Sequence, residues 1–197
     1  MFWESKDFWP YWPDHGLIVV DMQKLLVTWR VPEIQGYLNK LVTKICAHIS
    51  MCLELWGEVV VVEFTSELLG DTLPIVLETA WIWHAKRSNW NSVFLQKKRA
   101  NLLDEKNVSA MHHFQQRKNN NSKQKYTVWW VNISKCVIET ALWVSKIFDT
   151  RIHAGLAMDP RSIEWNMLSR LNILVHYSWL LYVPEMKDDC HSLTDFL

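Results

Sequence analysis

Glycine is scarce in this sequence, where only five of 197 residues are glycine. Glycine lets a chain make tight turns and bring its backbone close to a phosphate group. Both glycine-rich phosphate-binding motifs are missing: no G-x-G-x-x-G follows the first apolar run, and G-x-x-x-x-G-K-[ST] does not occur. The sequence therefore gives no support to nucleotide binding.

An excess of one charge is also missing. Twenty-one lysines and arginines balance twenty-one acidic residues, so the formal net charge is zero. No basic stripe stands out, and we expect no nucleic-acid partner. No apolar run is long enough to span a bilayer. The first residues, MFWESKDFWPYWPD, lack the basic region and apolar core of a signal peptide, so we expect no membrane partner either.

Paired cysteines are absent as well. None of the four cysteines belongs to a C-x-x-C pair, and they lie at Cys46, Cys52, Cys136 and Cys190. Cys46 and Cys52 fall on different faces of a predicted helix, which argues against a mutual disulfide. This usage indicates a reducing compartment, and we expect the protein in the cytoplasm. The eight histidines show no metal-ligand spacing, so no metal site is predicted.

The sequence does contain apolar runs that alternate with helical patterns. Residues 16–21 and 58–64 are typical of strands buried on both faces, and an amphipathic helix opens at Pro32 and stops at Gly57. Further strands are predicted at 81–85, 126–131, 150–156 and 173–177. Further helices are predicted at 91–103, from 134 onward, and at 162–171.

This alternation predicts one α/β domain over residues 1–197, with a mostly parallel sheet of about six strands covered on both faces. Residues 1–15 form a lead-in and residues 183–197 a polar tail. The stretch 104–125 is rich in Asn, Gln, Lys and His, and we interpret it as a polar insertion or exposed loop.

Cys136 stands where the apolar period changes from strand to helix. A β-branched and aromatic run ends at Val131, and apolar residues then recur at helical spacing, at Val137, Ala141, Val144 and Phe148. Cys136 would then lie in the first turn of a helix, with Ser134 as its N-cap. Unpaired N–H groups there favour a thiolate and could stabilise an oxyanion. A nucleophile is one interpretation, and a small buried core residue is the other.

Asp21, Lys86 and Cys136 each lie at or just after the end of a predicted strand. The carboxyl ends of parallel strands share one edge of a sheet, so these residues can converge. In that case Cys136 attacks a carbonyl carbon, Asp21 takes and returns the proton, and Lys86 lowers the pKa of the thiol. The alternatives are a strand-end acid in a surface ion pair and an ordinary exposed lysine.

Three stretches carry a resemblance to a known family. GLIVVDMQ, a lysine ahead of SNWNSVF, and SKCVIETA occur in this order and together resemble the isochorismatase-like cysteine hydrolases, which include nicotinamidases. The resemblance spans roughly residues 16–177. It implies a Rossmann-like three-layer α/β/α sandwich and hydrolysis of a C–N bond in a small amide through a covalent cysteine intermediate.

The resemblance also implies the roles of particular residues. Asp21, Lys86 and Cys136 would form the catalytic triad, and backbone N–H groups of Asn132, Lys135 and Cys136 would receive the oxyanion. No cofactor is required. We expect a small-molecule substrate and a homo-oligomer.

Departures from the family keep other hypotheses open. Trp130 stands where the family usually has glycine. The number of residues between Lys86 and Cys136 is also larger than usual. Lys97 and Lys98, which lie within a predicted helix, are therefore alternative candidates for the triad lysine. The metal ligands of nicotinamidases have no match after Phe64. The alternative is a member that keeps the fold, has lost turnover and acts as a binding or assembly protein. A third reading, a redox-sensing thiol, needs a resolving cysteine, and none is close in sequence.

Overall fold

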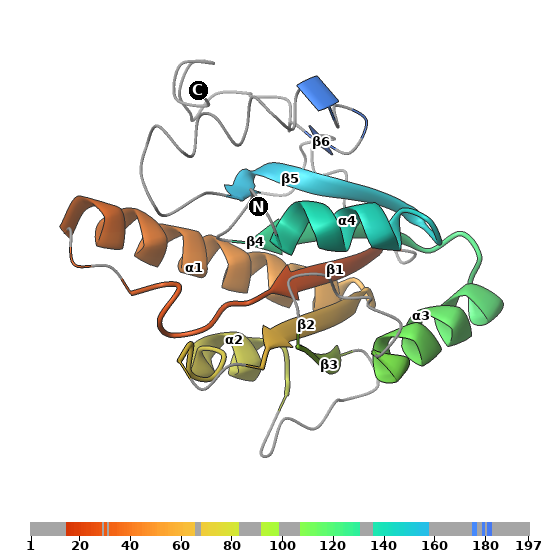
Figure 1. Cartoon of the computed structure of the whole chain (residues 1–197), viewed down its shortest axis with the longest axis horizontal. Helices are drawn as coiled ribbons and strands as arrows, with labels where there is room; N and C mark the ends of the chain where they lie inside the picture. Colours follow the sequence, from red (N-terminus) through yellow and green to blue (C-terminus); the bar gives the residue numbers. More distant parts are fainter. Residues whose placement is uncertain are drawn as a thin grey trace.

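The computed structural model describes residues 15–28, 30, 32–65, 68–82, 92–98, 107–130, 136–157, 175–176, 179 and 181–182. Strands and helices alternate along most of this part of the chain (Figure 1). In order they are β1 (His15–Val20), α1 (Pro32–Glu54), β2 (Glu58–Phe64), α2 (Pro74–Thr79), β3 (Ser92–Lys97), α3 (Val108–Asn120), β4 (Lys125–Trp130), α4 (Ile138–Val144), β5 (Asp149–Ala157) and β6 (Leu181–Tyr182).

The strands form one six-stranded sheet in the order β3-β2-β1-β4-β5-β6. Every pairing in it is parallel, and β1 is central, with β2 and β4 as its neighbours. Val20 at the end of β1 stands in register with Val62 and Trp130. The carboxyl ends of the strands therefore meet at one edge. The predicted α/β class with a parallel sheet is confirmed.

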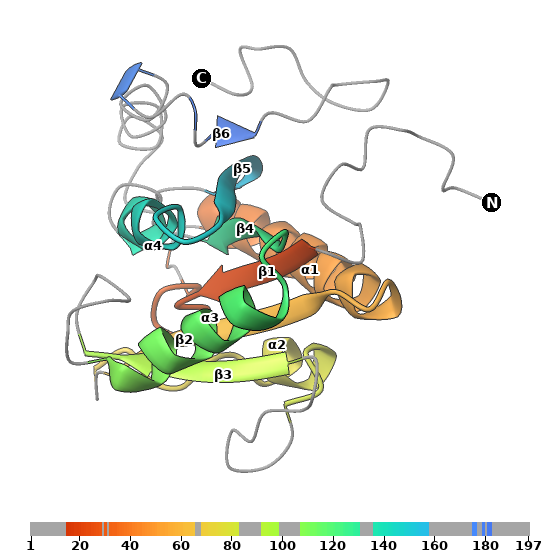
Figure 2. The same cartoon turned by 90° about the vertical axis from the view of Figure 1, so that its right-hand side faces the viewer.

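Helices cover both faces of the sheet. Successive side chains of β4 point to opposite faces, so Tyr126 contacts Phe114 of α3 while Trp129 contacts His48 of α1. Phe114 also contacts Trp143 of α4. Figure 2 shows α3 and α4 on one side of the sheet and α1 and α2 on the other, which gives the three layers of an α/β/α sandwich.

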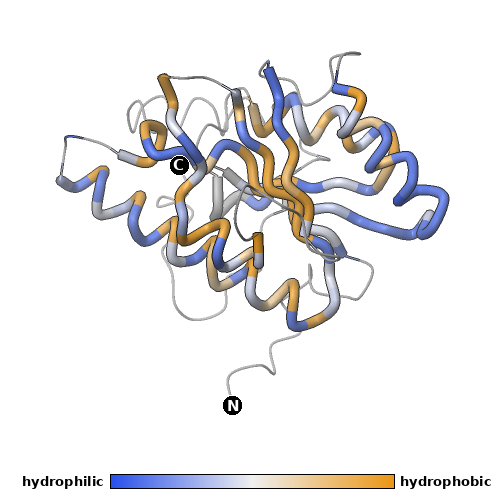
Figure 3. Tube along the Cα trace, turned by 90° about the horizontal axis from the view of Figure 1, so that it is seen from below, coloured by the Kyte–Doolittle hydropathy of each residue, from blue (hydrophilic) through white to orange (hydrophobic). Residues whose placement is uncertain are grey.

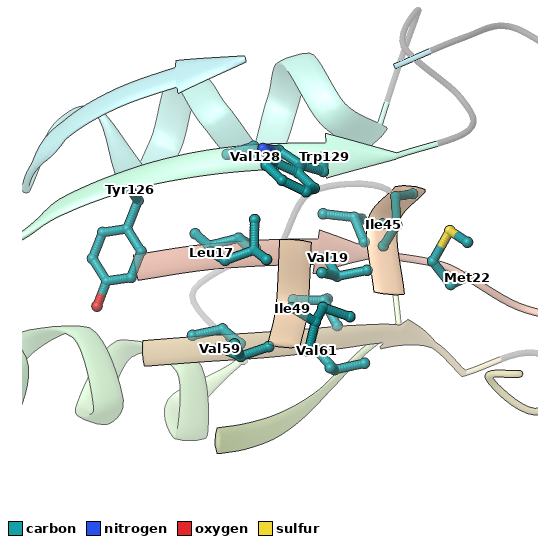
Figure 4. Packing of buried hydrophobic residues seen from close by; sticks show 14 of the residues in the cluster. Leu17, Val19, Met22, Ile45, Ile49, Val59, Val61, Tyr126, Val128 and Trp129 are labelled. Carbon is teal, nitrogen blue, oxygen red and sulfur yellow. The ribbon is translucent and has the colours of Figure 1, made fainter. Parts of the chain in front are cut away.

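One part of the core lies between the sheet and α1, and another lies under α3 and α4. The predicted helix face of α1 is buried, including Leu38, Ile45 and Ile49. These side chains pack on apolar residues of β1 and β2 (Figure 4), and Figure 3 shows the apolar strands enclosed by helices with polar outer faces. At about 25 cal/mol per Å² of apolar surface, this burial is the main source of stability. Among the described residues, no helix is long and apolar enough to cross a membrane.

The third strand was placed wrongly by the sequence. Trp81 and Ile82 lie in a turn after α2, and residues 83–85 fall outside the described part of the chain. The third strand is instead β3, within the predicted helix 91–103. Helix-forming Leu, Gln and Lys side chains stand here on an edge strand, because pairing with β2 overrides intrinsic propensity.

Two other predictions are corrected. Val175 and His176 are helical where a sixth strand was expected, and the sixth strand is the short β6. The polar stretch 104–125 contains α3 rather than only a loop. Asn107 caps this helix by accepting a hydrogen bond from the Ala110 N–H at 3.2 Å. Phe114 is fully buried, so one aromatic side chain anchors an otherwise polar helix.

Candidate active site

Asp21 lies at the carboxyl end of β1, as the sequence predicted. Its backbone N–H donates to Val62 O at 2.7 Å, and its carbonyl accepts from the Gln23 N–H at 2.7 Å. Its φ is +52°, in the left-handed region that non-glycine residues seldom adopt, though aspartate tolerates it better than most. Such strain persists where the surroundings fix it, and it is common at functional sites. Because of this turn, the Asp21 side chain no longer follows the alternation of strand side chains between the two faces of the sheet.

Lys97 is the lysine that meets Asp21. Its Nζ lies 2.9 Å from Asp21 Oδ2, and both side chains are almost completely buried, at 1% and 2% exposure. Lys97 ends β3, which is separated from β1 by β2. Neighbouring strands lie about 4.8 Å apart, so only a long side chain can span that distance. The predicted triad lysine, Lys86, lies outside the described residues.

Cys136 completes the cluster from the other side of β1. It lies beyond β4 and begins a π-helical turn with Val137 that leads into α4. The thiol is half-buried and lies close enough to Asp21 and Lys97 for both side chains to affect its pKa. Residues from three strand ends, 21, 97 and 136 in the sequence, therefore come together at one sheet edge. The convergence of Asp21 and Cys136 was anticipated, and the structure supplies Lys97 as their cation.

Burial raises the pKa of Cys136 to about 12; Lys97 acts to lower it, and Asp21 to raise it. With this raised pKa, Cys136 is protonated at neutral pH. The sequence had instead favoured a thiolate, because Cys136 was expected in the first turn of a helix. Burial also raises the pKa of Asp21, although Lys97, Cys136 and the Phe64 backbone oppose that shift. Burial of the cysteine outweighs the dipole of a seven-residue helix that begins two residues further on.

Most of the remaining predicted site residues lie outside the described part of the chain. Asn132 and Lys135, expected to help bind an oxyanion, lie outside the described residues, as does Ser134. The Trp130 backbone pairs with Val20 and Ala157, and its side chain is not among those described. The oxyanion site therefore stays a prediction.

Two buried polar side chains near this cluster hold the loop after β2. For Glu63, at the end of β2, the sequence left open a place in the pocket or a structural ion pair, and it assigned no role to Gln23. The Glu63 carboxylate accepts from Thr72 N and Oγ1, both at 2.9 Å, and from Gln96 Nε2 at 3.1 Å. These bonds make Glu63 an anchor for the loop after β2 rather than a pocket residue. Gln23, the Gln of D-M-Q, donates to two carbonyls of the same loop. Only its place two residues after Asp21 could have signalled this.

Metal binding has no basis in the described residues. No three of their His, Cys, Asp or Glu side chains gather closely enough to hold an ion. Asp21, the acid at the centre of the cluster, is already paired with a lysine ammonium.

Comparison with solved structures identifies the fold. A nicotinamidase from Staphylococcus aureus is similar with a TM-score of 0.64 at 12% identity, over 88% of this chain and 99% of that one. An isochorismatase from Pseudomonas putida has a TM-score of 0.60 at 12% identity, over 89% and 90%. The MAR1 ribonuclease from Caenorhabditis elegans has a TM-score of 0.58 at 15% identity, over 81% and 71%.

These likenesses show that the chain has the isochorismatase-like fold, as the sequence motifs predicted. At such low identity they concern the fold alone. A scan against protein-family models finds no match, and neither does a search of curated proteins.

Proposed function

We propose that this protein is a cysteine hydrolase that cleaves a C–N bond in a small amide, with Cys136 as nucleophile, Asp21 as proton carrier and Lys97 as electrostatic partner. One observation carries the proposal: the buried Asp21–Lys97 ion pair, 2.9 Å long, adjoins a half-buried cysteine thiol whose pKa both residues affect. The isochorismatase-like fold, shared with a nicotinamidase, supports it.

The first half of the reaction forms a thioester. Cys136 Sγ attacks the amide carbon while Asp21 takes the thiol proton, and the carbonyl oxygen becomes an oxyanion. The N–H groups predicted at 132, 135 and 136 would receive that charge. When the intermediate collapses, the C–N bond breaks and Asp21 gives its proton to the leaving amine. An acyl group then remains on Cys136.

The second half returns the free enzyme. Water attacks the thioester carbon, Asp21 takes the water proton, and the C–S bond breaks to release a carboxylic acid. Asp21 returns the proton to the departing thiolate. The Lys97 ammonium favours the ionised forms of Asp21 and Cys136 in turn, as the directions of its effects on both pKa values indicate.

The electrostatics suit a base-dependent nucleophile. With a pKa of about 12, Cys136 is a thiol at neutral pH, so it reacts only if a base accepts the proton as the C–S bond forms. The raised pKa of Asp21 makes that carboxylate a better acceptor than an ordinary surface acid. Both shifts have the same cause, which is burial of the cluster.

The test is hydrolysis of a panel of small primary amides, followed by ammonia release and by intact-mass detection of the acyl-enzyme. We expect turnover in the wild type, none in Cys136→Ala, and a loss of about 10²-fold or more in Lys97→Met. Lys98→Met is the matched control, because Lys98 is the exposed neighbour, and it should retain full turnover. A wild type that neither releases ammonia nor forms an adduct with any amide would contradict the proposal.

The same panel decides between the lysines. If Lys86→Met abolishes turnover while Lys97→Met does not, the assignment of Lys97 is wrong. The alternative of a non-catalytic binding or assembly protein was motivated by Trp130 and by the polar insertion. That stretch contains α3, which packs on the sheet through Phe114, so it gives the alternative less support than it did in the sequence.

A further inference from the structure

Lys97 is the last residue of an edge strand. β3 pairs with β2 and stands at one end of the sheet, so no strand of the described chain pairs with its outer side. From there the Lys97 ammonium reaches the Asp21 carboxylate, 2.9 Å away, across the width of β2. A side chain that spans two strand spacings, about 10 Å, places its ammonium accurately only if the backbone that carries it is fixed.

Two hydrogen bonds fix the backbone on either side of the Lys97 Cα. The Thr65 N–H donates to Lys97 O at 2.7 Å and so holds the peptide unit that follows this carbon. Asn107 Nδ2 donates to Gln96 O at 2.8 Å. The Gln96 carbonyl belongs to the peptide unit that precedes the Lys97 Cα, and it faces the outer side of β3, because successive carbonyls of a strand point to opposite edges. Asn107 therefore makes the bond that a neighbouring strand would make.

Asn107 can hold this carbonyl because it belongs to a docked helix. Its Oδ1 accepts from the Ala110 N–H at 3.2 Å and caps α3. The helix is packed on the sheet through the fully buried Phe114, and Arg117 joins it to Glu58. One carboxamide, with a donor and an acceptor on the same planar group, thus ties the end of an edge strand to the start of a helix.

We propose that Asn107 is a positioning residue for Lys97: it fixes the outer side of the strand end from which the Lys97 side chain extends, and so keeps the ammonium in contact with Asp21. The inference deepens the proposed function and rests on it for its catalytic meaning. Asn107 acts through the backbone of β3 and is not a catalytic residue.

A serine substitution separates the bond to β3 from the cap of α3. Serine is about as good an N-cap as asparagine, but it is shorter and has no Nδ2. Asn107→Ser therefore keeps the cap, changes no charge and removes the bond to Gln96 O.

The matched control is Asn121→Ser, at the other end of α3. Asn121 Oδ1 accepts from the Lys123 N–H at 3.1 Å, and its Nδ2 donates to Gln124 Oε1 at 3.4 Å. The same chemical change there again removes a donated bond. It does so about 20 Å from Asn107, because α3 has 13 residues.

The first measurement is the pH titration of the Asp21 carboxyl, followed by ¹³C NMR and assigned by the loss of its signal in Asp21→Asn. The Lys97 ammonium acts to lower the pKa of Asp21. In Asn107→Ser the midpoint should therefore rise by about half a pH unit to one unit, which is the equivalent of one hydrogen bond. In Asn121→Ser it should stay at the wild-type value, although both variants lose some stability.

Two further readouts follow the same strand end. Hydrogen exchange of the Thr65 N–H, which is bonded to Lys97 O, should become about three- to tenfold faster in Asn107→Ser. In amide hydrolysis kcat should fall by a similar factor while KM is unchanged, because the ammonium is less often in place when the transition state forms. Asn121→Ser should leave both quantities at their wild-type values.

The outcomes separate the two proposals. An Asp21 midpoint that is unchanged in Asn107→Ser, or that rises equally in Asn121→Ser, would overturn the inference. If Asn107→Ser does not fold, the wild type decides: NMR coupling across the hydrogen bond from Asn107 ¹⁵Nδ2 to the Gln96 carbonyl ¹³C supports the inference, and its absence overturns it. Failure of the proposed function appears instead as absent turnover and absent acyl-enzyme in the wild type, while the Asp21 midpoints still differ between the variants.

Discussion

The two ends of the sheet each bury a carboxylate beside a cation and a weakly acidic side chain. At the carboxyl end these are Asp21, Lys97 and Cys136. At the amino end Glu58, the first residue of β2, accepts from Arg117 Nε and from Tyr126 OH, both at 2.5 Å. His113 Nε2 of α3 lies 3.4 Å from the same carboxylate. The two clusters contain the same kinds of groups, yet the pKa values of their carboxylates shift in opposite directions.

The difference lies in whether the partners of each carboxylate outweigh the effect of burial on its pKa. Burial alone would raise the pKa of Glu58, but the bonds and charges of His113, Arg117 and Tyr126 outweigh it, and the pKa is lowered. For Asp21, burial outweighs its partners, and the pKa is raised. Glu58 is thus held as a carboxylate with no tendency to take a proton, whereas Asp21 is prepared to take one.

This contrast separates a structural carboxylate from a chemical one. Glu58 docks α3 onto the sheet, because two of its partners come from that helix and a third from β4. The hydrogen bond to Glu58 and burial both raise the pKa of Tyr126, so its phenol stays protonated. Cys136 also stays protonated, but its neighbouring base can accept the proton. Burial by itself therefore does not distinguish the two carboxylates; the balance between burial and the charges of their partners does.

The largest effect is expected from Asp21→Asn. Without the proposed base, the protein should lose about 10²- to 10⁴-fold in amide turnover. The pKa of Cys136 should move the opposite way, falling below about 12, because Asp21 raises it through its charge and hydrogen bond. The measurement is thiolate absorbance near 240 nm, taken as the difference between each protein and its Cys136→Ala counterpart.

The matched change at the other edge is Tyr126→Phe, which should leave both the Cys136 titration and turnover as in the wild type. An unchanged Cys136 titration in Asp21→Asn would show that the two side chains are not coupled. In that case nothing would indicate that Asp21 can accept the Cys136 proton, and the two edges would not differ in their chemistry.

The next effect is on stability. Glu58→Gln should lower the free energy of unfolding by about 3 kcal/mol at neutral pH, because charged partners from α3 lose a buried carboxylate. The folded pKa of Glu58 lies below its reference value of 4.5. Its contribution is therefore present above that value and is lost as the pH falls through the folded pKa. Urea denaturation at pH 7 and at pH 3 measures it, and the difference between wild type and variant should shrink in acid.

Turnover should be unchanged in Glu58→Gln, since about six residues of β2, or about 20 Å, separate Glu58 from the carboxyl edge, where Asp21 lies. A stability difference that persists undiminished at pH 3 would mean that the charge of Glu58 does not hold α3.

The sequence predicted one edge much better than the other. Asp21 and Cys136 follow long apolar runs at changes of period, so their place at the carboxyl edge could be inferred. Lys97 could not, because SVFLQK has helix-forming side chains and becomes a strand only by pairing with β2. Glu58, His113 and Arg117 are joined by tertiary contact across more than fifty residues, and no local pattern records that contact. Because α3 is mostly polar, its residues showed no clear helical pattern. The helix is held on the sheet by Phe114 and by the ion pair between Arg117 and Glu58.

Replacing both members of the buried ion pair by neutral side chains should maintain or raise stability, whereas most substitutions lower it. Asp21→Asn combined with Lys97→Met removes a buried ion pair whose acid has a raised pKa. Such replacements are often neutral or stabilising by about 1–4 kcal/mol. The folded pKa of Asp21 exceeds the reference value of 3.8, so the ionised group reduces stability increasingly as the pH rises from that value through the folded pKa. The variant should therefore match or exceed the wild type in urea at pH 7 while turnover is lost.

The corresponding pair at the amino edge, Glu58→Gln with Arg117→Met, should lose stability instead. Equal losses in both double variants would mean that the ion pair at the carboxyl edge stabilises the fold as the one at the amino edge does. The distinction drawn from the pKa values of Asp21 and Glu58 would then be wrong.

The smallest effect is expected at Gly16, where the amino edge depends on a missing side chain. A Cβ added there would lie 2.2 Å from Cε1 of Tyr126, whose ring crosses β1 on its way to Glu58 (Figure 4). Gly16→Ala must displace the ring and lengthen the hydrogen bond to Glu58, at a cost of about 1–3 kcal/mol. Gly36→Ala is the control, because no atom lies within 4 Å of the added carbon. If both variants unfold at the same urea concentration, the Tyr126–Glu58 hydrogen bond does not support this edge, and Glu58 holds α3 through Arg117 and His113.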